Sequence, residues 1–332
     1  MKCLTLTAIK SPLEFEERDA LTPGTGEVVV RIKAAALNRR DYWIVLGMYP
    51  GIELPCVLGS DGAGVVTLCG EGVDSSWKNR EVIINPGLDW GDDPKVQNPQ
   101  FNILGLPRDG TFATEVVVSA SQLHDRPGHL DWNESAALPL AGVTAYRAVF
   151  TQGNLQPGER VLVTGVGGGV ATFAVQFAVA AGAKVWVTSS SAAKIEAAVK
   201  LGADGGFNYT DEDWWKQMSK DVGAPSLIID SAGGPGYKAL LNLADAGGRI
   251  VNYGATAGPP EKVDLFKLFW KQLHLIGSTM GSPADFAAML ELVNTHKLRP
   301  VVDAVFPLND GDTAISQMAS SPQFGKYVLT ND

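Results

Sequence analysis

A glycine-rich turn, Gly165–Ala171, in the middle of the chain is the first candidate for a functional site. A short apolar run, Val161–Val163, precedes it, and small and apolar residues follow it as far as Ala181. A run of β-branched and aromatic residues then spans Lys184–Thr188. This order predicts a strand, a tight turn, a helix and a second strand, which together form one βαβ unit.

Such a turn can bind the pyrophosphate of a dinucleotide. Glycine lets backbone N–H groups approach the phosphates closely, and the start of a helix carries positive partial charge. Glycines also make flexible turns that bind nothing, but here they lie between a predicted strand and a predicted helix. We therefore expect Gly167–Gly169 and Val170 to bind a nucleotide.

The end of the second strand indicates which nucleotide. A site that prefers NAD usually places Asp or Glu there to bind the ribose 2′-hydroxyl. Here Ser189–Ser191 stand in that place, and Lys194 follows them. A carboxylate would repel a 2′-phosphate, whereas hydroxyls and an ammonium would bind it. We therefore expect NADPH, although serines at this place also cap helices and both roles can coexist.

The elements that position these residues form two regions. The first third of the chain consists of short β-type runs separated by Gly and Pro, which predicts a compact, partly barrel-like β domain. The clearest runs are Val28–Ile32, Gly64–Leu68, Glu81–Ile84 and Glu115–Val118. Between the first two lie a polar and aromatic cluster, Asn38–Trp43, and a glycine-dense stretch, Pro55–Gly64, that predicts a tight chain path. Leu88–Pro107 has three prolines and little periodicity, so we expect a surface loop.

From Glu134 the pattern becomes helical, and after the βαβ unit strands alternate with helices, which predicts a doubly wound, six-stranded parallel sheet. The later strands are expected at Gly206–Tyr209, Leu227–Asp230, Arg249–Gly254 and Leu273–Gly277. Asp285–Asn294 has the periodicity of a further helix. The last β-type runs, Val301–Leu308 and Gly325–Leu329, have no place in that sheet. We expect them to return to the N-terminal β domain.

The length, the net charge and the cysteine content exclude several classes of protein. A chain of 332 residues is long for one core, and its net charge of −9 offers no basic surface for nucleic acid. Cys3, Cys56 and Cys69 cannot all pair and form no C-x-x-C motif, so we expect free, mostly buried thiols in a reducing compartment. No signal peptide or membrane span stands out. We expect a soluble, cytoplasmic protein that binds no membrane and acts on a small molecule.

Four stretches together resemble the medium-chain dehydrogenase/reductase superfamily: Asn38–Asp41, Leu58–Gly64, Gly165–Ala171 and Gly325–Leu329. Within it, Val166–Ala171 is similar to the glycine signature of the quinone oxidoreductase branch, with Ala171 in place of the last glycine. The resemblance implies a GroES-like, β-barrel-type catalytic domain from residues 1–135 and 280–332. It implies a Rossmann domain from residues 136–279.

The alcohol dehydrogenases of this superfamily hold a catalytic zinc with two cysteines and a histidine. The matching positions here are Asn38, Ser60 and Leu140, none of which is a useful zinc ligand, and Asp61 alone cannot make a site. The loop 88–107 also lacks the four cysteines of a structural zinc lobe. Alcohol oxidation needs a Lewis acid, whereas hydride delivery to a conjugated acceptor needs only hydrogen-bond donors. The resemblance therefore implies a metal-free, NADPH-dependent oxidoreductase that reduces an activated alkene, enone or quinone.

The resemblance also implies individual site residues. Asn38 and Asp41 match an Asn and an Asp beside the nicotinamide of relatives, and Tyr42 stands one place before their tyrosine, where this chain has Trp43. Asp41 could instead cap a helix or pair with a neighbouring arginine. Cofactor contacts are implied at Thr144, Gly167, Gly168, Gly169, Val170, Ser189, Ser190, Ser191, Lys194, Tyr209, Ser231, Tyr253, Gly254, Met280 and Lys326. For Tyr209 the alternative is a place in the core.

Two alternative functions remain open. The first is an enoyl-thioester reductase of a biosynthetic pathway, for which Arg39 and Arg40 would be basic residues at the mouth of the cleft. The second is a non-catalytic protein that binds or senses NADPH. Whichever function holds, the resemblance implies a homodimer that is joined by edge strands near Leu273–Gly281.

Overall fold

A computed structural model describes residues 1–320 and 323–331 of the chain. The chain forms two compact units, one from Met1–Ala141 with Ser282–Asp332 and the other from Gly142–Gly281. The boundaries predicted from the sequence were 135/136 and 279/280. Within the described part of the chain, no helix has both the length and the apolar composition needed to cross a membrane.

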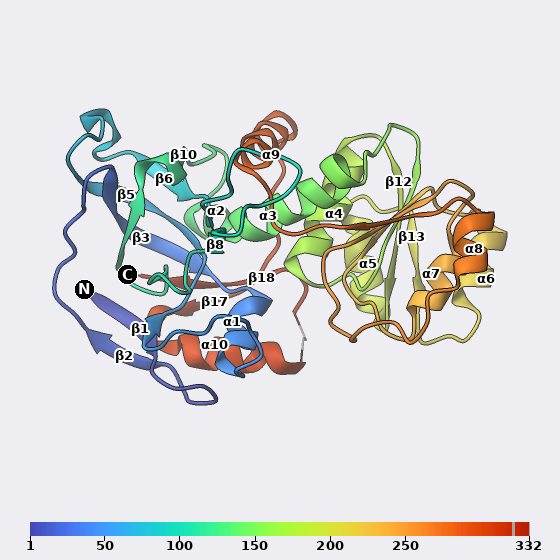
Figure 1. Cartoon of the computed structure of the whole chain (residues 1–332), viewed down its shortest axis with the longest axis horizontal. Helices are drawn as coiled ribbons and strands as arrows, with labels where there is room; N and C mark the ends of the chain where they lie inside the picture. Colours follow the sequence, from blue (N-terminus) through green and yellow to red (C-terminus); the bar gives the residue numbers. More distant parts are fainter. Residues whose placement is uncertain (321–322, 332) are drawn as a thin grey trace. The chain divides into compact units, whose positions relative to one another are not determined.

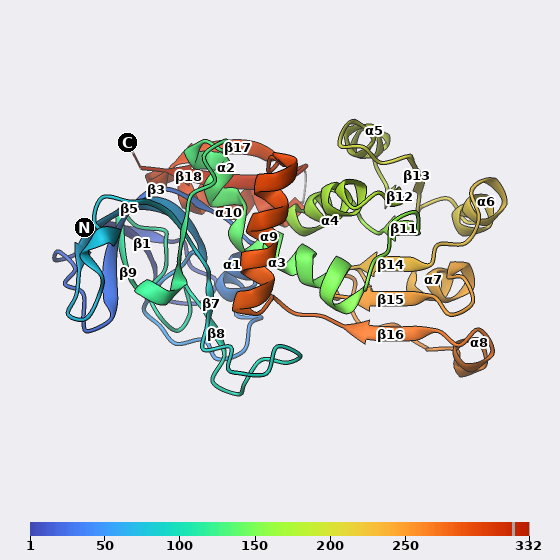
Figure 2. The same ribbon diagram turned by 90° about the horizontal axis from the view of Figure 1, so that it is seen from above.

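The second unit is built on one parallel sheet of six strands, and the predicted doubly wound arrangement is confirmed. Helices α4 and α5 lie on one side of this sheet and α6, α7 and α8 on the other (Figures 1 and 2). In spatial order the strands are β13 (Gly205–Asn208), β12 (Lys184–Ser189), β11 (Arg160–Val163), β14 (Leu227–Asp230), β15 (Arg249–Asn252) and β16 (His274–Gly277). The helices are α4 (Gly169–Ala180), α5 (Ala192–Lys200), α6 (Trp214–Asp221), α7 (Tyr237–Leu243) and α8 (Leu265–Trp270).

The first unit is built mainly on a mixed sheet in the order β10-β6-β5-β3-β18-β17, with β9 also paired to β3. Its pairs are antiparallel except for β17 with β18, which is parallel. Its strands are β3 (Glu27–Ala36), β5 (Asp61–Cys69), β6 (Glu81–Ile84), β9 (Glu115–Ser119), β10 (Leu123–Asp125), β17 (Val302–Pro307) and β18 (Lys326–Thr330). A smaller sheet pairs β1 (Lys2–Leu6) with β2 (Glu14–Glu17) and β4 (Cys56–Val57). Because β18 pairs with β3, the expected return of the tail to the N-terminal β domain is confirmed.

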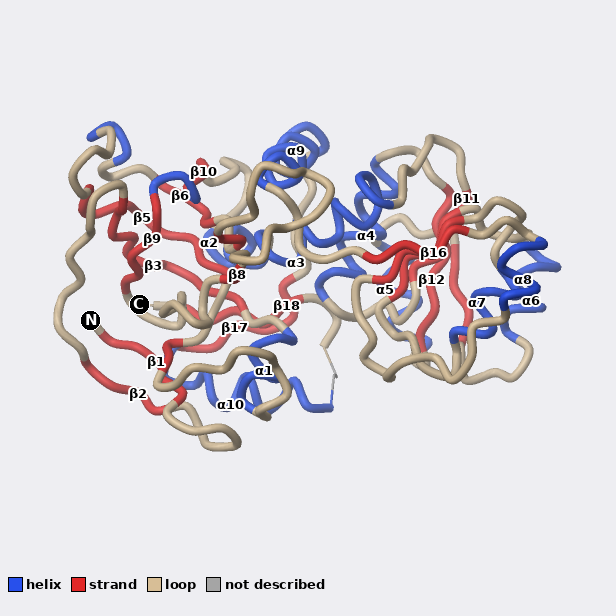
Figure 3. The backbone as a smooth tube through the Cα atoms, in the orientation of Figure 1, coloured by secondary structure: helices blue, strands red, loops and turns tan. Residues whose placement is uncertain are grey.

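Short helices complete the first unit. Helices α1 (Arg39–Val45) and α10 (Gly311–Gln317) lie side by side next to β17 and β18, as Figure 3 shows. Helix α2 (Trp132–Ala137) packs on β3 and β5. Helix α9 (Pro283–His296) includes residues 285–294, where the sequence predicted a helix. Helix α3 (Pro139–Tyr146) contains the boundary between the units and continues as a π-helical turn at Arg147–Gln152.

The stretch 88–107 is only in part the predicted surface loop. It contributes to a two-stranded pair, β7 (Gly87–Leu88) with β8 (Asn102–Ile103). The side chains of Trp90, Leu104 and Leu106 are buried. The sequence prediction failed here because isolated apolar residues between prolines show no periodicity, although each can still fill a place in the core.

The glycine-dense stretch does follow a tight path, because Gly59 and Gly64 lie close to other backbone segments and Gly62 lies close to side chains. A Cβ on Gly64 would lie 2.1 Å from the carbonyl oxygen of Arg31, on the neighbouring strand β3. We expect Gly64→Ala to lower the free energy of unfolding by about 3 kcal/mol or more, since backbone cannot move aside as a flexible side chain can. Urea unfolding monitored by fluorescence measures this change.

Gly128→Ala is the matched control, because a Cβ on Gly128 meets nothing within 4 Å. It should change stability by no more than about 0.5 kcal/mol. Equal stabilities for the two variants would contradict the close strand approach at Gly64.

Candidate active site

Helix α1 begins at Asn38 because that residue and Asp41 exchange hydrogen bonds across the first turn. The backbone N–H of Asn38 donates to Asp41 Oδ2 at 2.7 Å, and the N–H of Asp41 donates to the Asn38 carbonyl at 3.0 Å. Asp41 therefore caps the helix, which was one of its two interpretations. Its other carboxylate oxygen, Oδ1, is buried and has no hydrogen-bond partner among the residues that the structure describes.

The Asn38 side chain lies in a buried polar cluster with Asp61 and Lys326. Lys326 Nζ donates to Asn38 Oδ1 at 2.6 Å and to Asp61 Oδ2 at 2.9 Å. Asn38 Nδ2 donates to the same Asp61 oxygen at 2.9 Å. The backbone N–H of Leu140 donates to Asp61 Oδ1 at 2.7 Å, so both carboxylate oxygens have partners. Lys326 is 4% exposed and Asp61 is fully buried.

Strand pairing brings these residues together. Ala36, at the end of β3, pairs with Asp61 at the start of β5 and with Val328 near the start of β18. Asn38 follows two residues after Ala36. One end of the sheet therefore collects an amide, a carboxylate and an ammonium from three distant parts of the chain. The sequence prediction grouped Lys326 with the cofactor residues and set Asp61 aside, because this pairing is not visible in the sequence.

A second buried group surrounds Arg40. Its Nη1 donates to Ser60 Oγ at 2.7 Å and to the Leu104 carbonyl at 3.0 Å, and its guanidinium lies over the ring of Tyr49 at 5.0 Å. Arg40 is 8% exposed. The expectation that Arg40 is a solvent-facing cation at a cleft mouth is therefore wrong, because its donors are used inside the unit. Tyr49 was not predicted, and no motif marked it.

Arg39 and Tyr42, also on α1, are less enclosed than Asn38. Tyr42 is half-buried against the β-domain core and packs on Trp43 with ring centroids 5.3 Å apart. Arg39 donates to the Met318 carbonyl at 2.6 Å, and its guanidinium lies 5.7 Å from the Tyr42 ring. Burial raises the pKa of the Asp41 carboxyl to about 6, although the charge of Arg40 and the N–H of Asn38 oppose the rise.

The glycine turn in the second unit has the geometry that a phosphate site needs. Gly165 and Gly167 have φ of 61° and 152°, which glycine adopts without strain. The N–H of Val166 donates to the Thr188 carbonyl at 2.8 Å, which holds the turn to β12. Gly168 is the N-cap of α4 and provides no side-chain cap, and nothing lies within 4 Å of where its Cβ would be. The first N–H groups of α4 are thus open to an anion.

The predicted 2′-phosphate residues lie at the end of β12, in the first turn of α5 and just after β13. Ser191 Oγ accepts from the Lys194 N–H at 3.4 Å, so the helix-cap role is present. Ser189 is buried and its Oγ accepts from the N–H of Ser191, whereas Ser190 is exposed. Tyr209 is 48% exposed and its N–H donates to the Ser189 carbonyl, so its alternative as a core residue is wrong.

The other predicted cofactor residues form two pairs. Thr144 Oγ1 donates to the sulfur of Met280 at 3.8 Å, and both side chains are buried. Tyr253 lies beside Ser231, and burial raises the pKa of its phenol to about 12. Gly254 follows Tyr253 and is exposed. The sequence prediction missed Asp230 at the end of β14, a buried carboxylate that accepts from Thr164 Oγ1 at 2.5 Å and Asn252 Nδ2 at 3.0 Å.

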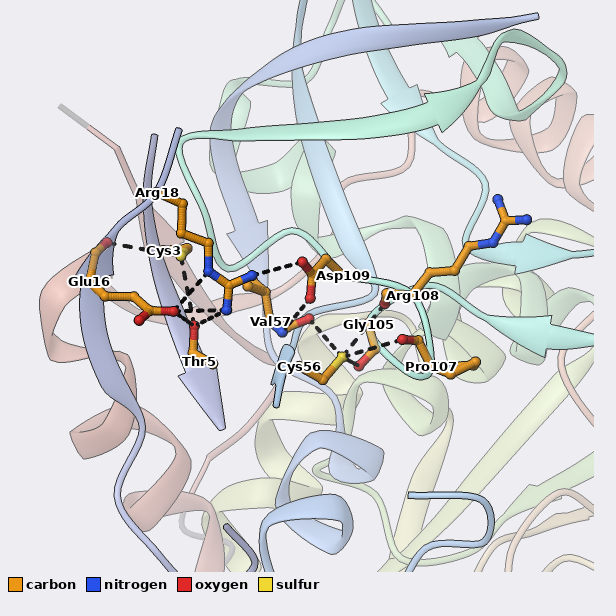
Figure 4. Close-up of polar contacts among 10 residues, drawn as sticks. All are labelled: Cys3, Thr5, Glu16, Arg18, Cys56, Val57, Gly105, Pro107, Arg108 and Asp109. Carbon is orange, nitrogen blue, oxygen red and sulfur yellow. Dashed lines mark hydrogen bonds and ion pairs between the residues drawn. The ribbon is translucent and has the colours of Figure 1, made fainter. Parts of the chain in front are cut away.

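The three cysteines are free, as predicted, and two of them are buried. Figure 4 shows the Cys56 sulfur directed at the carbonyls of Gly105, Pro107 and Arg108, at 3.6–3.8 Å. Burial raises the pKa of its thiol to about 12, so it stays protonated and is a poor metal ligand at neutral pH. Within residues 1–320 and 323–331, no group of three His, Cys, Asp or Glu side chains could hold a metal ion.

Two family models match the chain. Residues 24–128 match the alcohol dehydrogenase GroES-like domain, and residues 169–295 match the zinc-binding dehydrogenase model. A zinc-type alcohol dehydrogenase-like protein of Leptosphaeria maculans is 36% identical, over 96% of this chain and 94% of its own. An acryloyl-coenzyme A reductase of Sulfurisphaera tokodaii is 28% identical over 99% of both chains. A crystal structure titled NAD-dependent alcohol dehydrogenase matches over the full length of both chains, with a TM-score of 0.95 and 36% identity.

The raised pKa of Asp41 predicts a change of stability with pH. The folded state holds the Asp41 proton up to about pH 6, whereas an unfolded aspartate loses it near about pH 4. The free energy of unfolding should therefore fall as pH rises through this interval, by up to about 3 kcal/mol relative to Asp41→Asn, which cannot ionise. Urea unfolding of both proteins between pH 4 and 7 measures the difference.

Asp19→Asn, at an exposed position, controls for the change in net charge. Parallel pH profiles for the wild type and Asp41→Asn would show that burial does not hold a proton on Asp41.

Proposed function

Because the chain belongs to the medium-chain dehydrogenase/reductase superfamily, in its quinone and enoyl reductase-like branch, we propose a specific reaction for this oxidoreductase. It delivers hydride from NADPH to an activated alkene, an enone or a quinone, and it does so without zinc. The observation that carries the proposal is the buried cluster of Asn38, Asp61 and Lys326. It lies at the end of the sheet where alcohol-oxidising relatives are expected to hold a metal.

The residues at that place do not fit a zinc ion. Zinc takes thiolate, imidazole or carboxylate ligands, and the three matching positions carry an amide, a hydroxyl and an aliphatic side chain at Asn38, Ser60 and Leu140. Asn38 and Ser60 already bond to cations, namely the Lys326 ammonium and the Arg40 guanidinium. A divalent metal would have to displace these charges or lie beside them. We therefore assign no step of the reaction to a metal.

A nicotinamide cofactor supplies the hydride, and the chain supplies binding and polarisation. The open N–H groups of α4 suit the pyrophosphate, and Ser190, Lys194 and Tyr209 suit a 2′-phosphate. In a conjugated acceptor the negative charge that forms spreads from carbon to oxygen, so fixed hydrogen-bond donors can stabilise it. Asn38 and Tyr42 are the candidate donors in the first unit. Asp41, which holds a proton more firmly than an exposed aspartate, is the candidate relay.

A second candidate is reduction of an enoyl thioester, which the likeness to an acryloyl-coenzyme A reductase supports. The buried position of Arg40 removes one of the two basic residues that favoured this candidate. Arg39 remains half-buried, with one of its nitrogens bonded to the Met318 carbonyl.

One assay separates the candidates. NADPH oxidation at 340 nm is measured with a panel of quinones, enones and enoyl thioesters, on protein purified without chelator and analysed for zinc. We expect turnover of a quinone or enone with far less than one zinc per chain. Turnover of thioesters alone selects the second candidate. No turnover at all, or an activity that needs stoichiometric zinc, overturns the proposal.

Cofactor preference tests the role of Lys194. We expect tighter binding of NADPH than of NADH, and we expect Lys194→Ala to weaken NADPH by about 1.5–3 kcal/mol, as loss of one charge-assisted hydrogen bond does. NADH binding should change little. Fluorescence titration of both cofactors measures this. Lys200→Ala, on an exposed part of the same helix α5, is the control.

One similar solved protein is named an NAD-dependent alcohol dehydrogenase, so a preference for NADH is the competing expectation that this titration tests. Equal affinities for the two cofactors, or tighter NADH binding, would contradict the assignment of Ser189–Ser191 and Lys194 to a 2′-phosphate.

Asn38→Ala should lower turnover by about 10²–10³, the usual effect of losing one transition-state hydrogen bond. NADPH affinity should stay nearly intact, because Asn38 and the glycine turn belong to different units. Steady-state rates on a good acceptor, with the melting temperature as a check, measure the effect. Asn294→Ala, at an exposed position of α9, is the control. Full turnover by Asn38→Ala would remove α1 from the active site.

We also propose a homodimer, and the edge of the parallel sheet supports it. Strand β16 is the last strand of that sheet. Helix α8 exposes large apolar side chains nearby in sequence: Leu265, Phe266, Phe269 and Trp270, between 60% and 83% exposed. Such a patch usually marks a protein interface. Sedimentation should give a dimer, and Trp270→Glu should shift it toward monomer; a monomeric wild type at micromolar concentration contradicts the proposal.

A further inference from the structure

Lys326 is the least expected member of the buried cluster. A buried ion pair costs more in lost hydration than it returns unless every charge has partners. Here the ammonium has two partners and the Asp61 carboxylate has three, counting the Asn38 amide and the Leu140 N–H. Lys326 lies at the first position of β18, and the neighbouring strand residues, Tyr327–Leu329, are buried apolar side chains. An apolar residue at 326 would therefore fit the pattern of the strand as well.

The pair fixes the orientation of the Asn38 amide. An amide has an acceptor oxygen on one side and a donor nitrogen on the other. The ammonium of Lys326 can only donate, and it contacts Asn38 Oδ1; the carboxylate of Asp61 can only accept, and it contacts Asn38 Nδ2. A flipped amide would place donor against donor and acceptor against acceptor. Lys326 and Asp61 together therefore hold one of the two amide orientations.

The ammonium also lies among the positions where the zinc-dependent relatives are expected to hold their metal. It bonds to Asn38 directly, and its partner Asp61 follows Ser60 in the chain and accepts from the N–H of Leu140. We propose that Lys326 is the resident cation of this site, which replaces a metal in charge and holds Asn38 in the orientation that turnover requires. This inference rests on the proposed function and names a positioning residue for it.

The chemistry explains why a fixed cation would be useful. Hydride from the nicotinamide would add to the β-carbon of the acceptor, and the electrons of the carbon–carbon double bond would move to give an enolate oxygen. A proton from water, relayed by Asp41, would then bond to the α-carbon. A positive charge held in a water-poor site stabilises the enolate charge more strongly than the same charge in solvent. The third N–H of Lys326 has no partner among the residues that the structure describes.

Three variants test the proposal on a good acceptor of the wild-type protein. Lys326→Met removes the charge at similar length and should lower kcat by about 100-fold, with the Kd of NADPH changed by less than about threefold. Lys326→Arg keeps a charge and should recover at least about a tenth of the wild-type kcat. Lys33→Met, at an exposed position on β3, is the control and should behave as wild type.

A double variant separates a positioning role from simple charge balance. Lys326→Met leaves the Asp61 carboxylate buried without its cation and should lower the melting temperature, whereas Lys326→Met with Asp61→Asn removes both charges and should recover much of it. Turnover should stay low in the double variant. Recovery of turnover together with stability would overturn the proposal, because Lys326 would then only neutralise Asp61.

Two further outcomes are decisive. An unchanged kcat with a large rise in the Kd of NADPH for Lys326→Met would place Lys326 in the cofactor site and overturn the inference while the proposed function stands. A wild-type protein that reduces no acceptor would overturn both.

Discussion

The buried ion pair between Lys326 and Asp61 is the interaction on which the candidate site depends. It joins the start of β18 to the start of β5, and through Asn38 and Leu140 it reaches the first turn of α1 and the second residue of α3. Removal of either partner would leave a charge in an apolar interior, which is among the most destabilising changes a protein can suffer. The pair therefore constrains four segments that are distant in the sequence.

The two buried carboxylates nearby have different environments and so suit different tasks. Asp61 accepts hydrogen bonds on both carboxylate oxygens, and one of its donors is the ammonium of Lys326. Asp41 uses one oxygen to cap α1, and its other oxygen has no hydrogen-bond partner in the described part of the chain. Burial raises the pKa of this carboxyl to about 6. The first unit thus holds one carboxylate that is paired with an ammonium and one carboxyl whose pKa is raised by burial.

The glycine turn at Gly165–Ala171 depends on a different constraint, because its glycines carry no side chains that would cover the backbone. Gly165 and Gly167 adopt positive φ, and Gly168 caps α4 without a side chain, so the backbone N–H groups are not covered. The neighbouring Ser189–Ser191 segment is polar and carries no carboxylate. The second unit therefore contains a glycine turn with uncovered backbone N–H groups, and the first unit contains a buried cluster of charged and amide side chains.

The sequence alone determined the order of elements, the parallel sheet and its glycine turn, because periodicity and glycine placement are local properties. It also located the return of the tail to the β domain. It could not assign Lys326 to Asn38, since the two meet only because β3 pairs with both β5 and β18. Tertiary structure likewise decided that Arg40 is buried, that Tyr209 is exposed, and that Trp90 belongs to the core. These outcomes depend on which surfaces the folded chain covers, and a side chain's neighbours across strands are set by register rather than by its own sequence context.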